Sequence, residues 1–229
     1  MGDRRAKDAL YEGFAEVARA LASGRRAEIV DLLAQGERSV DEIASEIDQS
    51  VANTSHHLRA LARGGLLDSR REGTRIYYRL ASERVGELWT TLRDVAADLV
   101  AGFDRVAAAY LGERDGVDVV GRDELAARIA AGSVVVLDVR PPAEYVAGHI
   151  HGARSVPIAE LRRHLRSLPK DAELVAYCRG PYCIYADEAV RELRRKGFKA
   201  ARLEDGYPEW RRAGLPTSVA TERPQPAPT

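Results

Sequence analysis

The 229-residue chain is long enough for two domains of about 100 residues each, and an apolar fraction of 45% lets both bury a core. Acidic and basic residues balance, no apolar run is long enough to cross a membrane, and the N-terminal residues lack the apolar core of a signal peptide. We therefore expect a cytoplasmic protein without membrane contact. Two cysteines are too few for a disulfide scaffold, and in a reducing compartment they indicate reactive or ligating thiols.

The first 63 residues carry the apolar spacing and capping signals of four helices. A first helix with one apolar stripe is predicted to end at 23–24, and a second helix is predicted over 25–34. A capping box begins a third helix that runs through Ile47, and a serine caps a fourth helix over 50–63. The residues behind these predictions are Leu10, Phe14, Val17 and Leu21 in the stripe, and Ser39, Glu42 and Ser50 at the caps.

Beyond Gly64-Gly65 the pattern changes to a hairpin and then a long helix. Residues 66–70 and 75–80 have the extended character of strands, and 71–74 join them. A helix of about 30 residues is predicted from Ser82 to Leu111. Because a small domain cannot cover so long an apolar stripe, we expect this helix to pack against another subunit. The stripe consists of Val85, Leu88, Leu92, Val95, Leu99, Val106 and Tyr110.

After the boundary at 112–116, short β-branched runs alternate with helical segments, which predicts a parallel sheet covered by helices. The expected strands are 117–120, 134–138, 174–177 and 201–203, and the expected helices are 123–131 and 185–196. The domains are therefore predicted as 1–112 and 113–217, followed by a Pro-rich disordered tail over 218–229.

The first domain is predicted to be a mainly α winged helix-turn-helix, because two short helices joined by a tight turn precede a hairpin. The second helix of such a pair enters the major groove of DNA. Residues 50–80 hold six arginines against Asp68 and Glu72, so positive charge gathers where DNA phosphates would lie. Alone, such a run is usually a solvated surface. We expect contacts to double-stranded DNA from Ser50, Asn53, Thr54, Ser55, His56, His57, Arg59, Arg71 and Arg75.

Residues 51–67 and 71–80, with their Ser-His-His-Leu and Gly-Leu pattern and wing, resemble the ArsR family of winged-helix repressors. The resemblance covers roughly residues 7–111. It implies a homodimer built on the first and last helices that binds an inverted-repeat operator.

Many ArsR members sense metal through cysteines, and here the chain departs from the family. Residues 40–47 and 82–111 contain neither Cys nor His. His56 and His57 point about 100° apart on a helix, which disfavours chelation of one ion. We predict no metal site and no cofactor, so any sensing must reside elsewhere.

Cys178 follows the apolar run 174–177, and a helix is expected to begin after Cys183. Loops at the carboxyl ends of parallel strands are where α/β folds place ligand sites. Backbone N–H groups and the helix dipole would stabilise a thiolate or persulfide there, Arg179 adds positive charge, and Gly180 lets the backbone curve around the sulfur. These residues predict a nucleophilic sulfur. The alternative is a small buried apolar side chain, as free cysteine often is.

Three stretches, 137–157, 178–183 and 203–216, resemble rhodaneses in order and spacing, and the resemblance spans 117–217. It implies an α/β domain with a central parallel sheet, in which a loop cysteine takes sulfane sulfur from a donor as a persulfide and passes it to an acceptor. Cys178 would be the nucleophile, and the loop backbone would cradle its charge.

Four further residues match rhodanese motifs. Asp138 and Arg140 match the family's strand-end positions, and we assign them to structure or to positioning of the loop. His149 and His151 match its Gly-His-Ile motif, and we expect them to be hydrogen-bonded structural residues rather than functional ones.

The sixth loop position is Cys183, where sulfurtransferases often carry Arg or Thr. This departure removes a substrate-binding cation and supplies a thiol positioned to attack a persulfide on Cys178, giving a disulfide or a sulfur-bridged loop. A related phosphatase or arsenate reductase is disfavoured, because the arginine of its longer loop corresponds to Ile184. A thiophilic ion such as arsenite or copper(I) is a weaker alternative, since the pair offers only two ligands.

Two functions remain open at this point. The first is a DNA-binding transcriptional regulator in which a sulfane-sulfur donor modifies Cys178 and Cys183 and shifts the dimer between DNA-competent and DNA-incompetent states. The second is a sulfurtransferase enzyme that uses the winged helix for dimerisation or targeting. Both thiols lie outside the DNA-binding half, which favours the sensor, and the missing cation at Cys183 disfavours fast turnover.

Overall fold

The computed structural model of the protein describes residues 3–112, 114 and 116–220. The chain divides into two compact units, residues 1–100 and 101–229, so the division expected after residue 112 lies inside the second unit. Most of the expected tail, 221–229, lies outside the described residues. None of the described helices is both long and apolar enough to span a bilayer.

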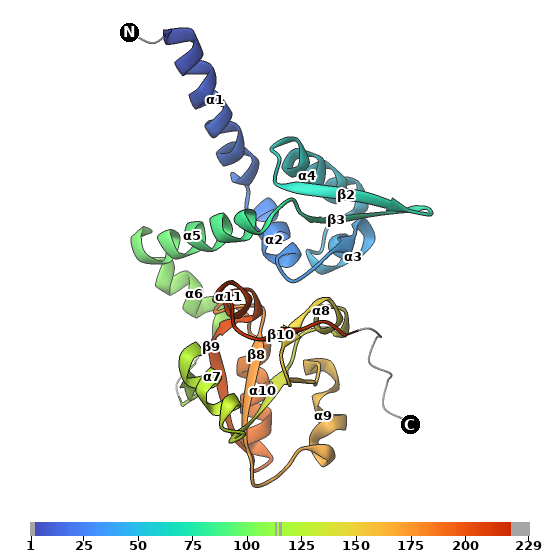
Figure 1. The fold of residues 1–229 in the computed structure, drawn as a ribbon, viewed down its shortest axis with the longest axis vertical. Helices are drawn as coiled ribbons and strands as arrows, with labels where there is room; N and C mark the ends of the chain where they lie inside the picture. The colour runs from blue at the N-terminus through green and yellow to red at the C-terminus, as the bar shows by residue number, and fades with distance from the viewer. Residues whose placement is uncertain (1–2, 113, 115, 221–229) are drawn as a thin grey trace. The chain divides into compact units, whose positions relative to one another are not determined.

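The first unit is mainly helical, with a three-stranded antiparallel sheet in the order β1-β3-β2 (Figure 1). Its elements are α1 (Arg4–Leu21), α2 (Gly24–Leu33), β1 (Arg38–Ser39), α3 (Val40–Glu46), α4 (Val51–Arg63), β2 (Leu67–Glu72), β3 (Arg75–Leu80) and α5 (Glu83–Leu99). The predicted winged helix-turn-helix is therefore present as α3, α4 and the β2–β3 wing.

Local capping sets the start of both helices of the helix-turn-helix. The backbone N–H of Ser39 donates to the Glu42 carboxylate at 2.8 Å, and the Glu42 N–H donates back to the Ser39 hydroxyl at 3.3 Å. The Ser50 hydroxyl accepts from the Asn53 N–H at 3.2 Å. These bonds satisfy N–H groups that have no partner within the helix. The capping box and the Ser50 cap are confirmed.

The wing differs from the prediction in its turn and in a third strand. Strand β2 continues through Arg71 and Glu72, so the turn is only Gly73-Thr74, with Gly73 at φ +60°. A two-residue hairpin turn needs positive φ, which glycine adopts without steric cost. The short strand β1 pairs with β3 on the side opposite β2. A strand of two residues is too short to show a periodic pattern in the sequence.

The helix predicted from Ser82 to Leu111 is wrong, because the structure contains two helices there. α5 ends at Leu99, Val100 is extended, and α6 (Phe103–Leu111) begins after Gly102, which has a left-handed φ of +82°. Glycine adopts this conformation readily, whereas other residues pay for it. α6 belongs to the second unit.

The second unit is a five-stranded parallel sheet in the order β4-β9-β8-β5-β7, with a small antiparallel pair, β10-β6, beside it. The elements after α6 are β4 (Val119–Val120), α7 (Arg122–Ala130), β5 (Val134–Asp138), α8 (Pro142–Ala147), β6 (His149–Ile150), β7 (Arg154–Ser155), η1 (Ile158–Glu160), α9 (Leu161–His164), η2 (Leu165–Ser167), β8 (Glu173–Cys178), α10 (Tyr185–Arg195), β9 (Lys199–Gly206), α11 (Tyr207–Arg212) and β10 (Thr217–Ser218). The predicted parallel sheet is confirmed.

Side chains along β8 alternate between the two faces of this sheet, as expected for a strand buried on both sides. Leu174, Ala176 and Cys178 pack into the apolar cluster formed with α9 and α10. Val175 and Tyr177 pack into the opposite cluster, with α7 and α11 (Figure 1). Cys178 is therefore the last residue of a central strand, on the α10 face.

Candidate functional site

The N-terminal cap and first three turns of α4 contain most of the residues expected to contact DNA. Ser50, Asn53, His56 and Arg59 are exposed, while Ser55 and His57 are half-buried. The Arg59 guanidinium donates to the carbonyl oxygen of Ser55 at 3.1 Å and remains on the same surface.

Thr54 does not belong to this surface. Its side chain is 0% exposed, and it lies on the inward stripe of α4 together with Leu58 and Leu61. Positions i, i+4 and i+7 share one face of a helix, so Thr54 faces the core whenever Leu58 and Leu61 do. The expected contact between Thr54 and DNA is therefore withdrawn.

The surroundings of His57 lower its pKa and so favour the neutral form. Burial lowers its pKa, and the positive charges of Arg26, His56 and Arg25 lower it further. A neutral imidazole donates or accepts hydrogen bonds but adds no charge to the DNA-facing surface.

Carboxylates neutralise part of the positive charge of the wing. Arg70 pairs with Glu37 and Glu72, and Arg79 pairs with Asp68 at 3.2 Å. Within residues 3–112 the structure shows no ion pair for the other arginines of this region, which are Arg59, Arg63, Arg71 and Arg75. These four are the cations best placed to meet phosphates.

The cysteine loop occupies the strand-to-helix connection predicted from the sequence. Cys178 ends β8, residues 179–184 form the loop, and α10 begins at Tyr185. Cys178 is only 2% exposed and Cys183 is half-buried.

The two cysteines form a disulfide, with their Cα atoms 6.3 Å apart. The Cys183 N–H donates to the Gly180 carbonyl at 3.1 Å, which closes the loop as a tight turn. This N–H is therefore directed at the loop backbone and not at the Cys178 sulfur. In this disulfide form the loop contains no charged sulfur. Stabilisation of a thiolate or persulfide by the loop N–H groups therefore stays a prediction for the reduced loop.

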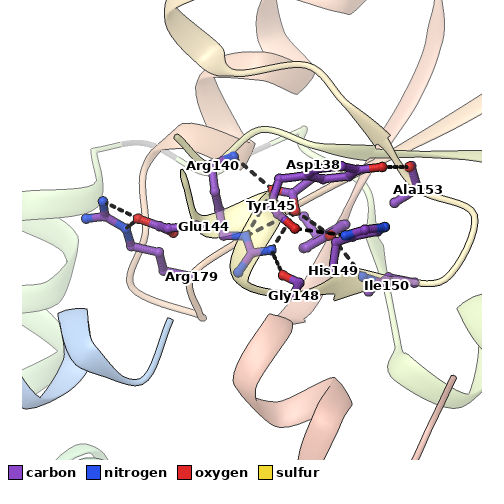
Figure 2. Close-up of polar contacts among 10 residues, drawn as sticks. Asp138, Arg140, Glu144, Tyr145, Gly148, His149, Ile150, Ala153 and Arg179 are labelled. Carbon is purple, nitrogen blue, oxygen red and sulfur yellow. Dashed lines mark hydrogen bonds and ion pairs between the residues drawn. The ribbon is translucent and has the colours of Figure 1, made fainter. Parts of the chain in front are cut away.

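Arg179 does not act as an uncompensated cation beside Cys178. Its Nε and Nη2 both donate to Oε1 of Glu144, at 3.0 and 2.7 Å, and Glu144 is 1% exposed (Figure 2). A buried carboxylate at this position offsets the guanidinium charge. Glu144 lies within the first rhodanese-like stretch, but nothing in the sequence signals which residue it pairs with.

Gly206 is a residue of the site that sequence reasoning missed. It ends β9 opposite Cys178, and a Cβ placed there would lie 2.3 Å from the Gly180 nitrogen and 2.4 Å from the Arg179 carbonyl carbon. The two backbones approach so closely that only glycine fits. The Glu-Asp-Gly-Tyr segment of the third rhodanese-like stretch is the signal that could have identified it.

Asp138 and Arg140 form a buried polar network beneath the loop. Arg140 Nη2 donates to Asp138 at 2.6 Å and to the Gly148 carbonyl at 2.7 Å, and Tyr177 donates to Asp138 at 2.5 Å (Figure 2). Burial raises the pKa of Tyr177, and Asp138 raises it further, so the hydroxyl keeps its proton and donates. Asp138 and Arg140 are fully buried, consistent with the structural role assigned to them.

The two histidines of the Gly-His-Ile motif are hydrogen-bonded. His149 Nδ1 lies 2.8 Å from the Tyr145 carbonyl oxygen, and its ring stacks on Tyr145 (Figure 2). His151 Nδ1 lies 2.8 Å from the Ser218 hydroxyl. In the described part of the chain, no group of three or more His, Cys, Asp or Glu side chains is arranged to hold a metal.

Comparison with known proteins matches each half of the chain to a family. The model of the bacterial regulatory protein, arsR family, matches residues 23–69, and that of the rhodanese-like domain matches residues 121–213. The HTH-type transcriptional regulator Rv0324 of Mycobacterium tuberculosis is 49% identical over 210 residues, which are 92% of both chains. The chain belongs to the ArsR family of transcriptional regulators. This ArsR-family chain carries a rhodanese-like domain as its second unit.

Two further proteins resemble one half of the ArsR-family chain. A sulfurtransferase of Allochromatium vinosum is 31% identical over 102 residues, 44% of this chain and 94% of its own length. The solution structure of a homodimeric winged helix-turn-helix fragment, residues 1–100 of a Mycobacterium bovis protein, is 47% identical. It covers 44% of this chain and 91% of its own, with a TM-score of 0.41.

Proposed function

We propose that this ArsR-family regulator senses sulfane sulfur at Cys178 and changes its affinity for an inverted-repeat operator when the cysteine loop is oxidised. The Cys178–Cys183 disulfide carries the proposal, because it brings the second thiol within bonding distance of the first. The chain has no other cysteine, so the thiols available for sensing lie together in the rhodanese-like unit.

The first chemical step is sulfur transfer from a polysulfide or organic persulfide. The thiolate of Cys178 attacks the outer sulfur of the donor, the donor's S–S bond breaks, and the donor leaves one sulfur shorter. The product is a persulfide on Cys178.

The second step uses the unusual sixth loop residue. The Cys183 thiolate attacks Sγ of Cys178, the bond between Sγ and the outer sulfur breaks, and hydrosulfide leaves with the bonding electron pair. Two thiols are thereby oxidised to a disulfide and one sulfane sulfur is reduced to sulfide. External thiols, abundant in the cytoplasm where we place the protein, would return the loop to its reduced form.

Exposed apolar residues on α1 and α5 support a homodimer as the DNA-binding form. Leu10 and Phe14 on α1 and Leu92 and Leu99 on α5 are between 43% and 77% exposed. Large apolar side chains left exposed on two helices are candidates for an interaction surface. A second copy of the chain covers it in our proposal, and the twofold symmetry of the dimer matches an inverted repeat.

Operator binding by the reduced and oxidised protein tests the proposal. Duplexes selected by the full-length protein from a random pool provide the operator, and fluorescence anisotropy measures affinity before and after polysulfide treatment. We expect the affinities of the two forms to differ by about 5–150-fold, the range of typical couplings between two sites. Mass spectrometry of the 178–183 peptide should show the persulfide and then the disulfide.

Two variants separate the chemical steps. Cys178→Ser should abolish any response to polysulfide, while Cys183→Ser should accumulate the persulfide without forming a disulfide. A wild-type protein that forms the disulfide with unchanged operator affinity would overturn the proposal.

A sulfurtransferase enzyme is the second candidate, favoured by the similarity to the Allochromatium vinosum sulfurtransferase. Steady-state transfer of sulfur from thiosulfate to cyanide distinguishes the two functions, because a sensor needs only one stoichiometric transfer. We expect slow turnover in the wild type, since Cys183 diverts the persulfide into a disulfide. Many turnovers per minute that depend on Cys178 but not on Cys183 would favour the enzyme.

A further inference from the structure

Helix α6, the first element of the second unit, is attached to the cysteine loop. Tyr182, the residue before Cys183, packs edge-to-face on Phe103 of α6, with ring centroids 5.7 Å apart and planes at 82°. Phe103, Ala107 and Leu111 form the inward face of α6, and Leu111 is buried. One aromatic contact therefore joins α6 directly to the loop that contains both thiols.

A second contact attaches the residues after α6 to the helix that follows the loop. Arg114 donates through Nε and Nη2 to Asp187 Oδ2, at 3.0 and 2.7 Å. Asp187 is fully buried in the first turn of α10, and Arg202 of β9 lies 3.2 Å from its other oxygen. Hydrogen bonds between a guanidinium and a carboxylate are strong, so Arg114 anchors the residues that follow α6 to α10.

An open surface depression lies beside Tyr182. Residues of α6 line it together with Gly112, Arg114 and Tyr182, and Tyr182 is half-buried. Because Tyr182 lines an open depression, fewer neighbouring atoms restrain it than restrain a residue of a close-packed core.

The state of the thiols controls the backbone beside Tyr182. The disulfide ties Cys183 to the end of β8 and so restrains its neighbour. Because Cys178 is 2% exposed, an added sulfur atom needs space that the loop must provide. We therefore expect reduction or persulfide formation to change the restraint on Tyr182.

The sequence across the junction of α5 and α6 favours a second arrangement. Leu99, Val106 and Tyr110 continue the apolar spacing of α5 and are all more than 60% exposed. Only Val100–Gly102 interrupts the helical backbone. One apolar face of α6, with Phe103 and Leu111, packs on the second unit, and the other apolar face is exposed. Such a helix is suited to two positions, one packed on the unit and one released from it.

We propose that α6 transmits the chemical state of the Cys178–Cys183 loop to the DNA-binding unit through the Tyr182–Phe103 contact. The disulfide holds α6 on the rhodanese-like unit, and opening of the loop frees α6 to change the C-terminal end of α5. This inference rests on the proposed function, whose regulation it assigns to named residues.

Hydrogen exchange of the full-length protein tests the coupling directly. Amides of residues 103–111 should exchange about two- to tenfold faster in the reduced protein than in the disulfide form, the factor that loss of one aromatic pair produces. Phe103→Ala should show fast exchange in both forms. Arg105→Lys changes an exposed residue of the same helix that lies on neither apolar face; it is the control and should behave as the wild type.

Operator affinity completes the test. The disulfide form of Phe103→Ala should bind operator as the reduced wild type does, although mass spectrometry shows its disulfide intact. Equal exchange of α6 in the two wild-type forms, or a wild-type affinity ratio in Phe103→Ala, overturns the inference. If affinity is the same in both wild-type forms while α6 exchange differs, the sensing proposal fails and the coupling of loop to α6 stands.

Discussion

Substitution of Gly206 tests the geometry around the cysteine loop most sharply. In Gly206→Ala the new Cβ would lie 2.3 Å from the Gly180 nitrogen, whereas ordinary contacts begin at 3.4 Å. The neighbour is backbone and cannot rotate away, so the loop must move by about 1 Å. The φ of Gly206, −121°, suits any residue, so the whole effect comes from the collision.

Overpacking of this kind typically costs about 1–3 kcal/mol, and backbone neighbours place Gly206→Ala in the upper part of that range. For a unit of this size the midpoint of thermal unfolding should fall by roughly 4–12 °C. The displaced residues directly follow Cys178, so disulfide formation with polysulfide should also slow.

Thermal unfolding followed by circular dichroism and mass spectrometry of the 178–183 peptide over time provide the two measurements. Gly121→Ala is the matched control, because a Cβ at Gly121 meets nothing within 4 Å and its φ is −69°. If Gly206→Ala unfolds and reacts as Gly121→Ala does, the close approach of β9 to the loop is wrong.

Three further predictions concern single side chains. Asn53→Ala should weaken operator binding by about 1–3 kcal/mol if Asn53 reads a base, while Thr54→Val should leave it unchanged because Thr54 is buried; an equal loss in both, measured by anisotropy, would contradict the outward and inward assignment. Arg71→Gln should lower the salt dependence of DNA binding by about one phosphate contact, and Arg70→Gln should lower it less because carboxylates already engage Arg70; identical slopes would argue against this difference. Glu144→Gln should remove the negative charge that pairs with Arg179 and speed alkylation of the reduced loop thiol by iodoacetamide below pH 8; an unchanged rate would show that this carboxylate does not affect the thiol.

Local signals in the sequence predicted the elements that carry the chemistry. The capping box at Ser39 and Glu42 and the cap at Ser50 set helix starts by bonds that span only three residues, so neighbouring residues suffice to specify them. The β-branched runs of the second unit predicted its parallel strands for the same reason. The position of Cys178 at a strand-to-helix loop followed from this local order.

Burial and charge pairing that depend on residues far apart in the chain could not be predicted from local sequence signals. Thr54 lies beside exposed residues in the sequence, and only packing of α4 shows that it faces inward. Arg179 was expected to add positive charge beside Cys178, and its pairing with Glu144 was not foreseen because Glu144 is 35 residues away. Charge and burial depend on three-dimensional neighbours, which a linear pattern does not contain.

The sequence by itself determined that the chain joins a winged helix-turn-helix to a rhodanese-like domain, because capping, periodicity and loop motifs are short-range properties. Only the tertiary structure decided that the apolar stripe after Ser82 breaks at Gly102. The helical pattern runs through that residue, and beyond the break Phe103 packs against Tyr182 of the second unit. Contacts between segments far apart in the chain override local helix preference wherever they bury a face that the helix alone leaves exposed.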